Sequence, residues 1–354
     1  GAEIGTFNDS IIATKWSRYL DQDSVPPLSA FTFKEGGVTF GTTGTVAIDE
    51  DSLFISLDSL GHAGLTYTLS YARDWPALQD SAGYYTVNFT NTAVTNNIIG
   101  YEDEVDAYIA GITLSDSMAT HINTFVKAVK DSLNIATLDE IFDFMHILAN
   151  ENEDAAKRNL TERAHDITES ATNPTFDDFQ GYSGNGTSSY LIIDYNPATD
   201  ADNLALDDAS FGIYFITAPS GTHPGYGNGV YESDAGSRLW INPARNTDLE
   251  RGYINNASVI ERTFTGYVGL VTLTRTGSTT AYAMVNKVLG AVNEVESVAV
   301  PNGDIYLYAA NIDGNPGGYH TGEISFVFAG KGLTEAQIAD IYDCFDAYMT
   351  AIGN

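Results

Sequence analysis

Basic residues and cysteine are scarce in this chain of 354 residues. Only 16 Lys and Arg stand against 47 Asp and Glu, which gives a formal net charge of -31. This charge would repel a phosphate backbone, so nucleic acid is not expected as a partner. The single cysteine, Cys344, excludes an intrachain disulfide and a thiolate metal cluster. Its place beside Phe345 in an apolar helical pattern predicts a packing role.

Long apolar runs are also missing. No 18 apolar residues follow one another, so no membrane-spanning helix is expected. The opening GAEIGTFNDS has neither the basic nor the apolar region of a signal peptide, so none is expected in the chain as given. Hydrophobic residues still make up 43% and aromatic residues 12% of the chain. The composition and length therefore predict a folded protein of two domains.

One glycine-rich stretch, GYSGNGTSSYL, has the spacing of a phosphate-binding loop. Gly181 and Gly186 are separated as in G-x-x-x-x-G-K-[ST], but Thr187 occupies the position of the lysine. The residues that follow read as a strand, whereas a phosphate site needs a helix whose N-terminus faces the anion. The pattern instead predicts a glycine turn that places Tyr190 and Ile192 on one face of a strand.

The patterns required for hydrolysis are incomplete. A G-x-S-x-G motif fails at Asn185, and the six histidines form no H-x-x-x-H pair. Acidic residues cluster in EDEVDAY (102–108), beside a helical pattern, and in NEVESV (293–298), which lacks a third acid. A glycosidase on a β-sandwich would place three acids as E-x-D-x-E on one face of a strand, with carboxyl groups directed into the substrate cleft. Neither cluster offers this pattern on a predicted strand. We therefore predict that the chain is not an enzyme.

The first 100 residues show the alternation of short strands. Leu53, Ile55 and Leu57 recur at every second position, and Tyr67 and Leu69 belong to a second such run. The pieces VPPLSAFTF (25–33), LFISLDS (53–59), GLTYTLSYARD (64–74) and LQDSAGYYTVNFTNTAVTNN (78–97) resemble the SwmB-like branch of bacterial immunoglobulin-like domains, with a Tyr after the LQDSAG turn in place of the usual polar residue. The resemblance implies an Ig-like β-sandwich over residues 1–100 that serves as a spacer or surface decoration.

A period of three and four residues replaces the alternation after residue 100. The stripe from Met118 to Leu133 predicts one helix, and Thr137 with Glu140 forms a capping-box pattern that predicts a second helix through Leu148. We expect residues 101–170 to form a helical connector that links two sandwiches or packs on the second.

Residues 171–354 return to strands and end in a helix. Thr276-Gly277-Ser278 predicts a hairpin turn, and Thr334 with Gln337 caps a final amphipathic helix that stops at Gly353. The stretches 138–161, 173–215 and 266–287, with the closing GKGLTEAQIADIYDCFDAYMTAIGN, resemble a C-terminal module of bacteriophage virion proteins. That module is similar to concanavalin-like (LamG-type) jelly rolls.

The two resemblances imply an all-β chain: an Ig-like sandwich, a short helical connector and a concanavalin-like jelly roll closed by a C-terminal helix. They imply a structural protein on the surface of a virion, such as a capsid decoration, head fibre or tail fibre. Its partners would be other virion proteins, further copies of itself and a host surface glycan. A glycan-degrading depolymerase on the same sandwich and a bacterial cell-surface adhesin are the alternatives.

A carbohydrate site needs aromatic rings with polar groups beside them on ordered loops. The long Gly-rich excursion from residue 217 to residue 260 offers both. The candidate carbohydrate-binding residues are Tyr226, Asn228, Tyr231, Trp240, Arg245 and Tyr253. The same residue types also favour an interface with a neighbouring subunit.

Two loops are rich in the oxygen ligands that Ca²⁺ prefers, although neither has the EF-hand spacing. Turns stabilised by Asp and Asn explain the same composition without a metal. No cofactor is otherwise expected. The candidate calcium ligands are Asp194, Asp200 and Asp202 in DYNPATDADN and Asn311 and Asp313 in NIDGNPGG.

Overall fold

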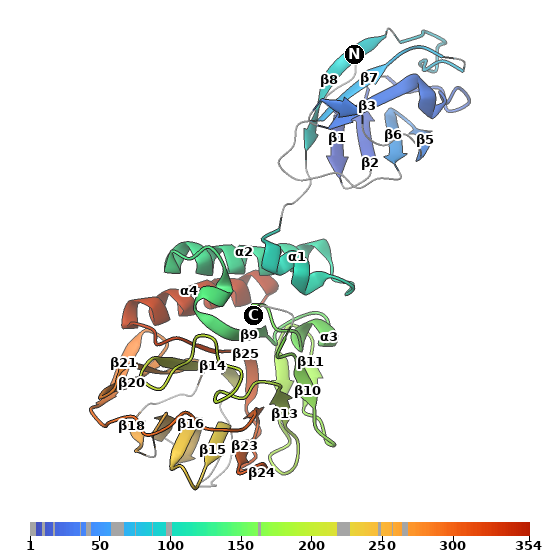
Figure 1. Cartoon of the computed structure of the whole chain (residues 1–354). Coiled ribbons are helices and arrows are strands. Elements are labelled where there is room, and N and C mark those ends of the chain that lie inside the picture. Colours follow the sequence, from blue (N-terminus) through green and yellow to red (C-terminus); the bar gives the residue numbers. More distant parts are fainter. Residues whose placement is uncertain are drawn as a thin grey trace. The chain divides into compact units, whose positions relative to one another are not determined.

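The computed structural model divides the chain into two compact units, Gly1–Gly100 and Tyr101–Asn354 (Figure 1). Residues 101–170, expected to form a connector, therefore lie within the second unit. The structure describes the whole chain except residues 1–4, 9–10, 17, 36, 40–43, 58–66, 75, 87, 97–100, 162–163, 218–226, 247–248, 257 and 264–267.

The first unit is a sandwich-like arrangement of antiparallel strands, with one parallel pair between β1 and β8. The predicted alternation is confirmed in β6 and β7, where every second side chain is buried. Ile12, Phe33, Ile55 and Leu69 from four strands share one core, so the two halves of the sheet face each other. The hydrogen-bonded order is β4 (Val38–Thr39), β3 (Phe31–Glu35), β7 (Tyr67–Tyr71), β8 (Phe89–Asn96), β1 (Gly5–Asn8), β2 (Ile11–Lys15), β6 (Ser52–Leu57) and β5 (Gly44–Asp49), with a 3₁₀ turn η1 (Leu28–Ala30) before β3.

The second unit contains a large sheet that faces two smaller ones. The order of the large sheet is β11 (Thr175–Asp177), β12 (Gly181–Ser183), β25 (Glu323–Gly330), β14 (Ala209–Thr217), β19 (Gly269–Gly277), β20 (Thr280–Val285) and β21 (Val288–Asn293), and β9 (Phe142–Ile147) also pairs with β25. The opposite sheets are β18 (Ile260–Thr263), β17 (Leu249–Ile254), β16 (Ser237–Asn246), β15 (Asn228–Glu232), β23 (Ala310–Ile312) and β24 (Asn315–Gly317), and β10 (Ile167–Glu169), β13 (Leu191–Ile193) and β22 (Ile305–Leu307).

The central strands of the large sheet, β25, β14 and β19, are buried on both faces. In β14, Phe211 and Ile213 point into the core between the sheets, whereas Tyr214 belongs to a second core beneath the helices. Figure 1 shows α2 and α4 side by side over this sheet. Strands covered on both faces have apolar residues at consecutive positions, because neither face meets water. The helices are α1 (Asp103–Ile109), α2 (Asp116–Leu133), α3 (Glu153–Ala156) and α4 (Glu335–Ile352), and η2 (Leu138–Glu140) is a 3₁₀ turn.

Two of the predicted helices are confirmed, and their caps explain their limits. The hydroxyl of Ser115 accepts a hydrogen bond from the Met118 N–H at the start of α2, and the whole predicted stripe is buried. Thr334 and Gln337 form the predicted capping box of α4, and Gly353 ends it in the left-handed conformation at φ 98°. The hairpin after Gly277 is also confirmed, since β19 and β20 pair across it.

The predicted helix from Thr137 to Leu148 is wrong. The capping box of Thr137 and Glu140 exists, but it supports only the 3₁₀ turn η2. The next six residues form β9, in which every side chain is buried. Apolar positions spaced as on a helix occur equally in a strand buried on both faces, so the period alone cannot separate the two.

The all-β sandwich class is confirmed by these sheets, and helices are few. None of the helices in the described ranges combines the length and hydrophobicity that a bilayer span requires. The predicted strand after the glycine turn is confirmed as β13. Gly181 itself begins β12, and glycine is required at this position. Its φ is 121°, and a Cβ atom would lie 2.1 Å from the Ile324 carbonyl oxygen of β25.

Candidate functional site

The hydrogen-bonding register of three neighbouring strands gathers aromatic residues on one face. Tyr231 of β15 lies opposite Arg238 of β16, and Trp240 lies opposite Tyr253 of β17. The residues between them, such as Leu239, belong to the core. Because successive side chains of a strand point to opposite faces, the aromatic residues lie on the outer face.

Arg238 is held between aromatic rings on this face. Its Cζ atom lies 4.1 Å from the centroid of the Tyr231 ring and 4.4 Å from that of Tyr253, within the range of cation–π contacts. Trp240 completes the group, with its ring centroid 6.2 Å from that of Tyr231 and 6.0 Å from that of Tyr253. We call these four residues the aromatic–arginine face.

Trp240 forms the floor of this face and is not a surface platform. Its side chain is buried, with 8% of its surface exposed, whereas Tyr231 and Tyr253 are half-buried. The indole Nε1 is buried without a hydrogen-bond partner in the described part of the chain. The backbone of Gly227 lies against the indole ring. Trp240 stays a candidate carbohydrate-binding residue, but its buried ring offers little face to a ligand and packs beneath the two tyrosines.

Replacing Gly227 with alanine is expected to displace the floor of the site. A Cβ atom at this position would lie 1.5 Å from Trp240 Nε1, so the indole or the strand must move. Such overpacking costs about 1–3 kcal/mol. Urea unfolding and tryptophan fluorescence should show a destabilised chain with a shifted emission maximum. Gly277→Ala is the control, since no atom lies within 4 Å of its Cβ, and equal behaviour of the two variants would contradict the packing described.

The other predicted carbohydrate-binding residues have different places. Asn228 is fully buried, and its Oδ1 accepts hydrogen bonds from the Tyr308 N–H at 2.8 Å and from His320 Nε2 at 3.0 Å. Asn228 therefore joins β15 to the segment between β22 and β23, which contains Tyr308. Tyr226 lies outside the described residues, as does the side chain of Arg245.

Arg238 is the residue that sequence reasoning missed. The signal was the alternation in SRLWIN, which puts Arg238 and Trp240 on the same face of any strand through them. The turn between β15 and β16 then decides that Tyr231 is the cross-strand neighbour of Arg238. The turn register is not readable from residue types alone, and Arg245 was named instead.

The proposed calcium ligands are engaged with protein groups. Both carboxylate oxygens of Asp313 accept hydrogen bonds from Ser233, which lower the pKa of Asp313. Burial acts to raise the pKa of Asp200, but hydrogen bonds from the Asn196 N–H and the Thr199 hydroxyl outweigh it and the net shift is downward.

The remaining candidates differ in their contacts. Asn311 Oδ1 accepts from the Gly314 N–H, and the Asp202 N–H donates to Asp143. Asp194 raises the pKa of nearby Asp304, after the larger effect of burial. Among the described residues, no three His, Cys, Asp or Glu side chains are grouped to hold a metal ion. Calcium binding by these loops stays a prediction.

The acidic cluster at the start of α1 is structural. Lys130 Nζ lies 2.7 Å from Glu102 Oε2 and 3.0 Å from Glu104 Oε2. Glu104 is buried and also accepts a hydrogen bond from the Leu138 N–H. These carboxylates join α1 to α2 and η2, so they do not face a substrate groove.

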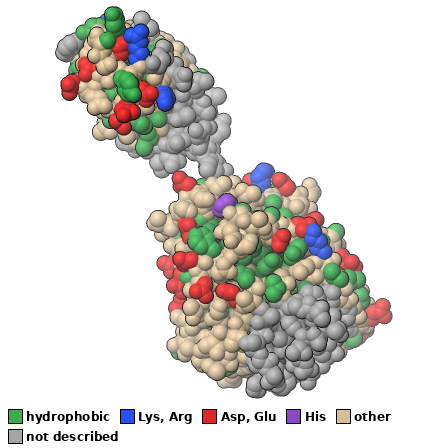
Figure 2. Space-filling view, turned by 180° about the vertical axis from the view of Figure 1, so that it is seen from behind, with side chains coloured by type: hydrophobic (Ala, Val, Ile, Leu, Met, Phe, Trp, Pro, Cys, Tyr) green, Lys and Arg blue, Asp and Glu red, His purple; other side chains and the backbone are tan. Residues whose placement is uncertain are grey.

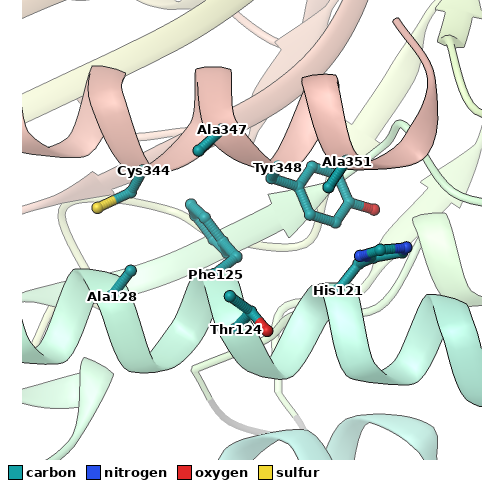
Figure 3. A pocket seen from close by; sticks show the side chains of 8 residues that line it. All are labelled: His121, Thr124, Phe125, Ala128, Cys344, Ala347, Tyr348 and Ala351. Atoms are coloured by element: carbon teal, nitrogen blue, oxygen red, sulfur yellow. The ribbon is translucent and has the colours of Figure 1, made fainter.

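A shallow groove runs along the seam between α2 and α4. Figure 3 shows small side chains along its walls, Cys344 near one end and His121 near the other. Its volume is 80 Å³, and an adjoining pocket of 210 Å³ shares His121 and Ala351 with it. Sites for small molecules usually measure about 300–1,000 Å³, so these hollows are small for a ligand.

No family model matches the chain, and no curated protein matches it in sequence. Among solved structures, the botulinum neurotoxin serotype D binding domain is 15% identical, with a TM-score of 0.39 over 58% of this chain and 52% of that chain. The receptor binding domain of botulinum neurotoxin mosaic serotype C/D is 12% identical, with a TM-score of 0.40 over 58% and 51%. The chain thus spans about half the length of these domains.

The CBM40 domain of a Ruminococcus gnavus IT-sialidase, bound to α2,3-sialyllactose, is 14% identical, with a TM-score of 0.31 over 39% of this chain and 84% of that chain. TM-scores of 0.31 to 0.40 are too low for a likeness to carry a function to this chain. The geometry of the aromatic–arginine face must carry that argument by itself.

Proposed function

We propose that this chain is a non-enzymatic structural and adhesive protein of a bacteriophage particle, and that its second unit binds a host surface glycan at the aromatic–arginine face. The observation that carries the glycan site is the pair of half-buried rings, Tyr231 and Tyr253, on either side of Arg238. Sugars present apolar C–H faces to aromatic rings and hydroxyls to charged or amide groups. The face supplies both kinds of contact.

The scaffold favours binding because the groups are held in advance. All four residues of the face lie on paired strands, and Trp240 is fixed between a sheet and the Gly227 backbone. Side chains placed on strands are positioned more accurately than those on free loops, and little freedom is then lost on binding.

Replacing Tyr253 with alanine is expected to weaken glycan binding about tenfold, because an aromatic contact contributes about 1–1.5 kcal/mol. A glycan array followed by titration calorimetry of the best hit measures the effect. Tyr85→Ala is the matched control: Tyr85 also lies under an arginine, Arg73, but it is exposed and belongs to the first unit. An array with no hit would contradict the proposed glycan site. Equal affinities of the Tyr253 variant and the intact chain for the glycan would contradict it as well.

The particle assignment is supported by the resemblance of about residues 115–354 to a virion module. As a capsid decoration, head fibre or tail fibre, the protein would sit on the virion surface and contact other virion proteins and copies of itself. Antibodies against this chain should label the outside of intact particles in electron micrographs. Labelling of bacterial cell envelopes in the absence of particles would contradict the assignment and favour a cell-surface adhesin.

A further inference from the structure

Arg238 is a half-buried cation that lacks an acidic partner among the described residues. No carboxylate among the described residues lies within ion-pair distance of it. This is unexpected in a chain with 47 acidic and 16 basic residues, and Figure 2 shows acidic side chains spread over one face of the second unit with few basic ones. Carboxylate partners are found for Lys15, Arg18, Lys127, Lys130, Lys157 and Lys287.

The aromatic rings leave one direction of approach to the guanidinium. Tyr231 and Tyr253 lie 4.1 Å and 4.4 Å from Arg238 Cζ, and the Nε atom is buried without a hydrogen-bond partner in the described ranges. A ligand group must therefore meet Arg238 along the edge of the guanidinium, where its N–H donors point. That edge fits a planar group with two anionic oxygens better than a single hydroxyl.

The tyrosine rings also fix the charge in place. Their π faces attract the cation and restrain a long side chain that would otherwise move freely in water. A half-buried cation without a counterion is incompletely solvated, so an incoming anion gains more there than at a fully exposed arginine.

We infer that the glycan bound at the aromatic–arginine face is acidic, with a carboxylate or sulfate of the sugar taking the free edge of Arg238. This inference rests on the proposed glycan site and adds its substrate class. The sugar ring would contact Tyr231 or Tyr253 while its anionic group meets the guanidinium.

The test uses the full chain and matched saccharides on an array. The probes are oligogalacturonates and their methyl esters, sialyllactose and lactose, and sulfated and unsulfated lactose. The same set is applied to Arg238→Gln and to the control Arg73→Gln, which removes the same charge from an arginine over a tyrosine in the first unit. We expect binding of at least one acidic probe, at least tenfold weaker binding of its neutral counterpart, and a tenfold or greater loss in Arg238→Gln only.

Comparison of the acidic probes that bind shows whether the site prefers a carboxylate or a sulfate. Preference for neutral probes, or acidic binding that Arg238→Gln leaves unchanged, would overturn the inference while leaving a glycan site in place. Binding of no saccharide at all would overturn the glycan site and the inference together. Thermal unfolding of Arg238→Gln identifies a variant that has lost its fold, and in that case Arg238→Lys, which keeps the charge but not the planar edge, takes its place with the same expected loss.

Discussion

Asp143→Ala is expected to lower the free energy of unfolding of the second unit by about 3–5 kcal/mol. The Asp143 carboxylate is buried in β9 and accepts four hydrogen bonds. Its donors are the Tyr195 hydroxyl at 2.7 Å and the N–H groups of Asp202, Asn203 and Leu204 at 3.1, 2.7 and 2.9 Å. Alanine would leave all four donors without an acceptor in a site that water does not easily reach.

Urea unfolding followed by circular dichroism measures this loss. Asp143→Asn should be intermediate, because it keeps one acceptor oxygen but turns an N–H₂ group toward backbone donors. Asp178→Ala removes an exposed carboxylate and should change stability by no more than about 0.5 kcal/mol. A loss below about 1 kcal/mol in Asp143→Ala would show that the loop from residue 196 to residue 204 does not depend on this carboxylate.

Acidification from pH 7 to pH 5 is expected to cost the second unit about 4 kcal/mol of stability through two buried histidines. Burial lowers the pKa of His146 to about 3 and that of His320 to about 3, from 6.5. Below pH 6.5 the unfolded chain takes up a proton at each histidine, whereas the folded chain does so only near pH 3. Stability is therefore full above pH 6.5 and falls as the pH falls through this window.

The hydrogen bonds explain why His320 stays neutral. The Gly322 N–H donates to its Nδ1 at 3.1 Å, so Nε2 carries the proton and donates to Asn228 Oδ1 at 3.0 Å. Measuring the unfolding free energy at several pH values in His146→Gln, His320→Gln and the double variant tests the prediction. Each single variant should remove about half of the slope, whatever its stability at pH 7. An unchanged slope in the double variant would assign the pH dependence to other groups.

The sequence predicts those elements whose residues meet water on one side. The stripe of α2 and the capping box of α4 are legible because polar residues mark the exposed face and the ends. β9 has no such exposed side. It pairs with β25, and its side chains enter a core on each face of the sheet. A segment with no exposed face carries no period, and the local capping signal at Thr137 then misleads.

The candidate site could also be predicted from the sequence only in part. Tyr231, Trp240 and Tyr253 could be proposed together because they lie in one long Gly-rich excursion, and the structure does bring them together. Which of them is exposed depends on Gly227, whose contact with the indole no local pattern reports. Arg238 joins them only through the register of β15 and β16, which the turn between the strands decides.

The position of β25 in the chain has a consequence for biosynthesis. This strand pairs with β9, β12 and β14, so residues 323–330 join three earlier segments of the large sheet. A ribosome adds about 5–20 residues per second, starting from the N-terminal end. About half of the chain is therefore synthesised between β9 and its partner strand. The first unit has all its strands within residues 1–100 and can fold long before. During that interval the apolar strands of the second unit lack their partners, so we expect this unit to be more prone to aggregation during synthesis than the first.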